Sequence, residues 1–123
     1  MRLLIFIFIF SVSIFAHDDS KSRSSIFLND IKASPDQFDK IELIDNKYKL
    51  IYEKMFAKLE TSNSKLSEAI QQTPFNEKKV VSKINDNFSL RAKMKLYNIK
   101  HHLEIEDLLN SYQRMKFNEF FKP

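Results

Sequence analysis

The chain of 123 residues contains no glycine, and this absence limits the folds that it can adopt. At average usage of about 7%, roughly nine glycines would be expected. Without them, tight turns with positive φ are disfavoured, and glycine-rich phosphate loops and dinucleotide-binding fingerprints are excluded. The strong helix breakers are Pro35, Pro74 and Pro123. The composition therefore predicts a few long helices joined by short connections.

The first sixteen residues have the layout of a secretory signal peptide. Arg2 is followed by an apolar run from Leu3 to Phe10, and the stretch ends at Ala16. This run is shorter than the about 20 apolar residues that a membrane span needs. We expect residues 1–16 to be a signal peptide that is cleaved after Ala16, and the protein to be periplasmic. Because Ile14 is larger than the small residue usual at its position, an uncleaved N-terminal membrane anchor is the alternative.

Residues 17–123 contain no cysteine, so disulfides cannot stabilise this part of the chain. The core of one such small domain is marginal by itself, and we expect a homodimer to bury further apolar surface. The 19 basic and 16 acidic side chains of residues 17–123 are interspersed along the chain. Such mixing is typical of solvated helical surfaces, and nucleic acid is not expected as a partner.

Helix start signals divide the remaining chain. Residues 17–33 are expected to form a flexible N-terminus with a short helix at about 24–32, and residues 34–123 the helical domain. Ser34 and Gln37 form a capping box around Pro35, which predicts a helix from Pro35 to about Gln72. The weak helix formers at 61–64 are the expected place for a bend or break.

A second long helix is predicted from Asn76, its N-cap, to about Leu109. This helix carries two apolar stripes, one over Val81, Ile84, Phe88, Ala92, Leu96, Ile99 and Leu103, and one over Leu90, Met94, Tyr97, His101, Ile105 and Leu108. Two stripes need two partners. We expect the preceding helix to cover one stripe, as a hairpin, and a second subunit to cover the other.

A last short helix is predicted after Asn110, where Gln113 completes a second capping box. Its aromatic residues, Phe117, Phe120 and Phe121, are interpreted as core, with an exposed docking patch as the alternative. The predicted fold class is all-α: a hairpin of about four helices, two of them long.

Two short motifs at the capping boxes carry a resemblance to a known family. Residues 33–37 and 109–113 look like degenerate copies of the Leu-Thr-x-x-Gln motif of the small periplasmic Spy/CpxP family, although Asn110 and Ser111 replace the usual Thr and Pro. Further stretches resemble the heavy-metal resistance branch, the cobalt–nickel sensors of the CnrX type: residues 42–45, 58–59, 63–70, 74–76 and 101–109, with Phe117. The resemblance covers about residues 33–121 and implies a hooked helical hairpin that dimerises into a curved plate.

The resemblance also implies candidate metal ligands. The acidic ligand of the metal-sensing branch falls on Asp45 and its later histidine on His101, whereas its methionine position is Ile105 and its histidine pair falls near Ser24 and Leu28. Two retained ligands do not make a selective transition-metal site, which needs about four donors. No cofactor is therefore assigned, and nickel, cobalt, copper or zinc is the alternative.

Each candidate ligand also has a packing interpretation, which we favour. Asp45 and His101 both lie on apolar stripes, where an ion pair or hydrogen bond would satisfy them. His102 is expected to be exposed, and Glu104 to pair with His102 or Lys100; both are possible additional donors. His17, at the expected mature N-terminus, is a further weak chelator.

The sequence contains no recognisable catalytic constellation, and an enzyme is not expected. Two functions are weighed. The first is an envelope-stress protein of the Spy/CpxP type that binds unfolded or envelope proteins as a chaperone or stress adaptor. The second is a periplasmic heavy-metal sensor or resistance protein that signals to a membrane-bound regulatory partner.

Overall fold

The computed structural model describes residues 28–121, and this part of the chain is almost entirely helical. Its helices are α2 (Pro35–Gln71), α3 (Glu77–Glu106) and α4 (Ser111–Phe120). No strand occurs among the described residues, which confirms the all-α prediction. None of these helices is long and apolar enough to cross a membrane. The predicted signal peptide at 1–16 and His17 lie outside the described residues.

The chain divides into two units between Ala33 and Ser34. In the first unit, the described residues form a helical turn over 28–30, within the helix predicted at about 24–32. The turn ends at Lys32, whose φ of 54° lies in the left-handed region that favours glycine. Backbone bonds from Lys32 to Asn29 and from Ala33 to Leu28 close a Schellman motif. A chain without glycine uses lysine at this position.

Helix α2 begins at the predicted capping box. The Ser34 side chain accepts a hydrogen bond from the Gln37 N–H (3.1 Å), and the Gln37 side chain accepts one from the Ser34 N–H (2.8 Å). Pro35 occupies the first helical position, where its missing N–H costs nothing. The helix ends at Gln71, one residue earlier than predicted.

The bend expected at 61–64 does not occur, because α2 continues through these residues. The hydroxyls of Thr61 and Ser64 bond back to the carbonyls of Ala57 and Glu60, at 3.1 and 3.2 Å. The Ser62 side chain is buried against α3. The polar side chains that weaken an isolated helix therefore find partners within the folded hairpin.

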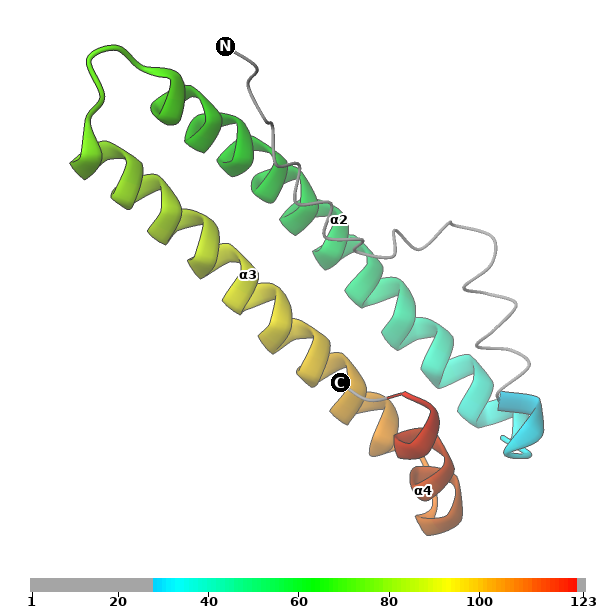
Figure 1. The fold of residues 1–123 in the computed structure, drawn as a ribbon. Helices are drawn as coiled ribbons and strands as arrows, with labels where there is room; N and C mark the ends of the chain where they lie inside the picture. Colours follow the sequence, from blue (N-terminus) through cyan, green and yellow to red (C-terminus); the bar gives the residue numbers. More distant parts are fainter. Residues whose placement is uncertain (1–27, 122–123) are drawn as a thin grey trace. The chain divides into compact units, whose positions relative to one another are not determined.

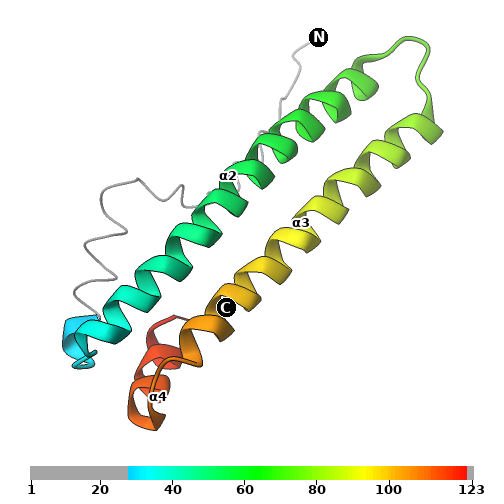
Figure 2. The ribbon, with the colours of Figure 1, turned by 180° about the vertical axis from the view of Figure 1, so that it is seen from behind.

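Helices α2 and α3 run antiparallel as the two arms of a hairpin, joined by residues 72–76 (Figure 1). Asn76 caps α3 as predicted, because its side chain accepts a hydrogen bond from the Lys79 N–H. The helix ends at Glu106, three residues before the predicted end, and a turn over 107–109 leads into α4. Viewed from behind, α4 lies beside the last turns of α3, at the end of the hairpin opposite the connection (Figure 2).

The hairpin buries an apolar stripe of α2 against one of the two apolar stripes of α3. We call this contact between the two helices the seam. On α2 the buried apolar residues recur at helical spacing: Ile41, Tyr48, Met55, Leu59 and Ala69. On α3 the stripe that contains His101 faces this seam, and Ile105 is buried there. The other α3 stripe is exposed at Val81, Ile84, Phe88, Leu96 and Leu103. The prediction that α2 covers one of the two α3 stripes is confirmed.

The C-terminal aromatic residues do not all have one environment. Phe117 is buried, as its interpretation as core predicted. Phe120 is 62% exposed, although its ring contacts Phe121 edge-on at 4.9 Å. The interpretation of this group as core therefore holds for Phe117 and is wrong for Phe120.

Candidate functional site

The structure brings together Asp45 and His101, which are 56 positions apart in the chain. The Asp45 Oδ1 lies 2.7 Å from the His101 Nε2, across the seam between α2 and α3. A carboxylate accepts, so Nε2 donates in this bond. The Asp45 side chain is 40% exposed and that of His101 is 21% exposed. The contact therefore lies at the edge of the seam, reachable from solvent.

Two tyrosines from α2 complete the surroundings of His101. The Tyr48 ring stacks on the imidazole with 4.5 Å between centroids and 10° between planes. The Tyr52 hydroxyl lies 3.3 Å from Nδ1. Both ring nitrogens of His101 thus have partners. We call Asp45, Tyr48, Tyr52, His101 and Glu104 the His101 cluster.

Glu104 connects the His101 cluster to a lysine on α2. Tyr48 donates a hydrogen bond to Glu104 at 2.6 Å, and Lys47 forms an ion pair with the other carboxylate oxygen. Lys47 also lies 4.8 Å from the centre of the Tyr48 ring. The expectation that Glu104 pairs with His102 or Lys100 is wrong, because α2 presents Lys47 and Tyr48 to it. Sequence spacing along one helix could not reveal partners on another.

These contacts shift the acid–base behaviour of the cluster. The hydrogen bond from Lys47, and then that from Tyr48, holds the pKa of Glu104 below its ordinary value. Burial, with the hydrogen bond to Glu104, raises the pKa of Tyr48. Burial, with the nearby Asp45 charge, raises the pKa of Tyr52 to about 12. Both tyrosines are therefore neutral hydrogen-bond donors at physiological pH.

The cluster does not by itself fit a selective transition-metal site. Asp45 and His101 supply two donors, while Glu104 is occupied by Lys47 and Tyr48. Within residues 28–121, no group of three or more His, Cys, Asp or Glu side chains could hold a metal ion. Two of the positions onto which ligands of the metal-sensing branch map hold buried apolar residues here, Leu28 and Ile105. A metal role for Asp45 and His101 stays a prediction.

His102 belongs to a separate group. Its ring stacks on Phe117 with 4.4 Å between centroids, and Nε2 donates to the Asn118 side-chain oxygen at 2.6 Å. Glu106 lies 3.9 Å from the same nitrogen, and the His102 side chain is only 9% exposed. The expectation of an exposed His102 is wrong, because α4 returns along α3 and covers it.

The two capping boxes are joined through their glutamines. The Gln37 Nε2 donates to the Gln113 Oε1 at 2.9 Å, and the Gln113 Nε2 donates to the Gln37 Oε1 at 3.1 Å. Gln37 Nε2 also donates to the Leu108 carbonyl at 2.8 Å. Within its own box Gln113 bonds Asn110 in both directions, at 2.9 and 3.0 Å. Both predicted boxes are confirmed, and the amide pair that links them ties the start of α2 to the start of α4.

A second polar layer lies in the seam between the His101 cluster and the connection. Asn87, which is buried, donates to the Asn63 side-chain oxygen at 2.6 Å and lies 3.4 Å from the Ser62 hydroxyl. Arg91 donates to the Asn87 oxygen at 2.9 Å. This layer was not among the features predicted from the sequence. Asn87 lies three residues before Leu90, and Ser62 lies three residues after Leu59. Both polar residues therefore share a helix face with apolar stripe residues, and this spacing could have predicted a polar layer in the seam.

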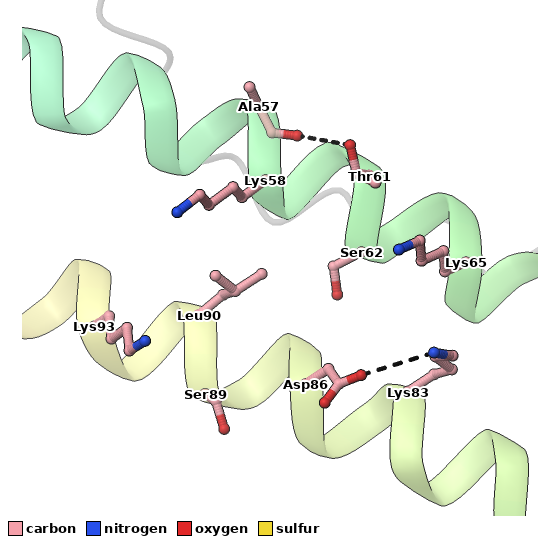
Figure 3. Close-up of a pocket in the computed structure, with 10 residues that line it drawn as sticks. All are labelled: Ala57, Lys58, Thr61, Ser62, Lys65, Lys83, Asp86, Ser89, Leu90 and Lys93. Atoms are coloured by element: carbon pink, nitrogen blue, oxygen red, sulfur yellow. Dashed lines mark hydrogen bonds and ion pairs between the residues drawn. The ribbon is translucent and has the colours of Figure 1, made fainter.

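An open depression beside this layer is lined by lysines from both helices, as Figure 3 shows. Lys58 and Lys65 come from α2, and Lys83 and Lys93 from α3. The other lining residues are small, hydroxyl-bearing, acidic or apolar: Ala57, Thr61, Ser62, Asp86, Ser89 and Leu90. Lys83 lies 3.9 Å from Asp86, while the other three lysines have no carboxylate within 4 Å among the described residues. The depression is therefore a largely basic surface that also includes apolar and hydroxyl-bearing residues.

No family model, no curated protein and no solved structure matches the chain.

Proposed function

We propose that this protein is a periplasmic envelope-stress protein of the Spy/CpxP type, which binds unfolded or envelope proteins as a chaperone or stress adaptor. The observation that carries the proposal is one face of the hairpin, which combines exposed apolar side chains with lysines that have no carboxylate within 4 Å in residues 28–121. Lys58, Lys65 and Lys93 surround the basic depression. Leu43 and Leu50 are large exposed apolar residues on the same helix as the first two lysines.

Helical geometry places these groups on one side of α2. At 100° per residue, Leu43, Leu50, Lys58 and Lys65 fall within about 80° of one another. Apolar side chains beside flexible cationic ones favour weak contacts with many sequences, because neither demands a fixed partner geometry. The resemblance of the two capping-box motifs to the Spy/CpxP family supports the same proposal.

The proposal is tested with the exported protein and a denatured model protein that aggregates on dilution. Suppression of light scattering is expected at near-stoichiometric amounts. The triple variant Lys58→Gln, Lys65→Gln, Lys93→Gln should lose at least half of this suppression. The matched control removes the same charge from the other end of the hairpin, with Lys40→Gln, Lys100→Gln and Lys116→Gln. Equal losses in both triple variants would count against a client surface at the depression.

We further propose that the protein is a homodimer and that the exposed stripe of α3 forms the interface. This stripe lies on the face of α3 opposite the seam and runs from Val81 to Leu103. A second copy would bury the same apolar stripe of its own α3. Sedimentation velocity should show a dimer for the native chain and a monomer for Phe88→Asp. Leu43→Asp, on α2, is the control that should stay dimeric.

The metal-sensor function is favoured by one observation, the 2.7 Å contact that brings Asp45 and His101 together. Neutral imidazole is the ligand form, so metal binding there should weaken in acid. Titration calorimetry with nickel, cobalt, copper and zinc tests this on native protein and His101→Gln. We expect weak binding that His101→Gln does not abolish. Submicromolar, pH-dependent binding that this substitution abolishes would place the sensor function first.

A further inference from the structure

The connected end of the hairpin presents large apolar side chains to solvent. We call residues 70–81 the hairpin tip. Ile70 and Phe75 are 56% and 64% exposed. The tip lies at the end of the hairpin away from α4 (Figures 1 and 2). Exposure of these side chains forgoes much of the hydrophobic stabilisation that full burial would give.

Two of the three charges in the first turn of α3 are unfavourable for that helix. Glu77 suits the helix dipole, whereas Lys78 and Lys79 lie where the dipole disfavours cations. The Lys79 ammonium donates to the Gln72 side-chain oxygen at 2.9 Å rather than to a carboxylate. Lys78 has no carboxylate within 4 Å among the described residues. An external anion beside the tip would compensate both lysines.

The shape of the tip favours an extended surface over a small ligand as its partner. A protruding turn cannot enclose a small ligand, but it can enter a soft surface. Apolar side chains next to ammonium groups match the boundary between lipid chains and anionic headgroups, where each group meets its preferred surroundings. Lys65, about 9 Å along α2 from the end of that helix, lies within a Debye length of such a surface and adds to the attraction.

We propose that the hairpin tip docks on an anionic lipid bilayer, with Phe75 entering the interface and Lys78 and Lys79 contacting headgroup phosphates. Docking would place the long axis of the hairpin away from the bilayer and leave the basic depression accessible. This inference shares Lys65 with the proposed chaperone surface, but the residues that carry it, Phe75, Lys78 and Lys79, do not line the basic depression.

A fluorescence experiment tests the docking directly, because the chain contains no tryptophan. Phe75→Trp places a reporter at the tip. Phe120→Trp places one at a side chain of similar exposure, 62%, on α4 at the other end of the hairpin. Each exported variant is mixed with vesicles of phosphatidylglycerol and phosphatidylcholine that contain brominated lipid, or with phosphatidylcholine vesicles alone. Circular dichroism checks that both variants keep the native helical content.

We expect the emission of Phe75→Trp to shift to the blue and to be quenched on the anionic vesicles only, while that of Phe120→Trp stays unchanged. Adding Lys78→Gln and Lys79→Gln to the tip reporter should weaken vesicle binding at least tenfold. The matched pair Lys40→Gln and Lys116→Gln should change it less than twofold. Equal quenching of both reporters, equal binding to neutral vesicles, or a blue shift with soluble polyglutamate but not with vesicles would overturn the proposal.

Discussion

The two halves of the hairpin use their charges differently. The proximal half (residues 34–52 and 96–121) has six Lys and Arg against eight Asp and Glu, and the distal half (53–95) has nine against five. Among the described residues, five acid–base contacts lie in the proximal half, and two of them join α2 to α3: Lys47–Glu104 and Asp45–His101. The distal half has one, the 3.9 Å contact of Lys83 with Asp86 on the same helix.

The seam shows the same difference. In the proximal half, α2 and α3 are joined by ionisable side chains, with Tyr48 and His101 stacked between them. In the distal half, the joining layer of Ser62, Asn63 and Asn87 is neutral, and Arg91 binds it from the rim. The proximal charges are therefore mostly paired within the fold, whereas most distal lysines have no carboxylate within 4 Å among the described residues. A basic composition says little about partners until the paired cations are set aside.

The largest loss of stability is expected when the pair of glutamine amides that joins the capping boxes is broken. Gln113 is 3% exposed and bonds Asn110 and Gln37. Gln113→Ala removes a buried side chain together with its hydrogen bonds to Asn110 and Gln37, and should lower the free energy of unfolding by about 3 kcal/mol. Urea denaturation measures the loss. Gln71→Ala, an exposed change at the distal end, should have almost no effect, and similar losses in the two variants would contradict the linked-box account.

Substitutions in the distal polar layer should lower the free energy of unfolding by less. Asn87→Ala removes the bonds to Asn63 and Arg91, both of which can turn to water, so we expect a loss of about 1.5 kcal/mol. Asn87→Leu should restore part of this stability, because an apolar side chain can pack in the seam without needing partners. If Asn87→Ala destabilises as much as Gln113→Ala, the two halves do not differ as we infer.

The N-caps allow a finer comparison. Ser34→Ala and Asn110→Ala should each cost about 1 kcal/mol, the usual value of a cap. Since the Gln37–Gln113 pair joins their boxes, the double variant should depart from additivity by at least 0.5 kcal/mol, on the order of other contacting pairs. Ser34→Ala combined with Asn76→Ala, the distal cap, should be additive. Thermal stability unchanged in both single variants would rule out the capping account.

The smallest effect concerns pH. Because the pKa of Glu104 is lowered in the fold, its stabilising contribution is present above the ordinary value of 4.5 and is lost as pH falls through the folded value. The stability difference between native protein and Glu104→Gln should therefore shrink between pH 6 and pH 3. The pair with Lys47 is solvent-screened, so the change should be small. Glu60→Gln, in the distal half, should show no such dependence.

The helices could largely be predicted from the sequence, because their signals are local. The starts of all three helices coincide with their predicted caps, Ser34, Asn76 and Asn110, since capping depends on residues three positions apart. The apolar stripes predicted the seam for the same reason, because helical periodicity sets which side chains share a face. The continuous course of α2 through 61–64 was not predictable in this way, because its polar residues are satisfied partly from α3.

What the tertiary structure alone decided is which distant side chains meet. Asp45 and His101 were identifiable as unusual residues on apolar stripes, but their contact, and the positions of Tyr48 and Tyr52 around it, required the relative alignment of two helices. The same alignment gives Glu104 its partner Lys47 and buries His102 beneath α4. Local sequence fixes dihedral angles and faces within a helix, whereas contacts between residues tens of positions apart depend on how whole helices pack, which many weak interactions determine together.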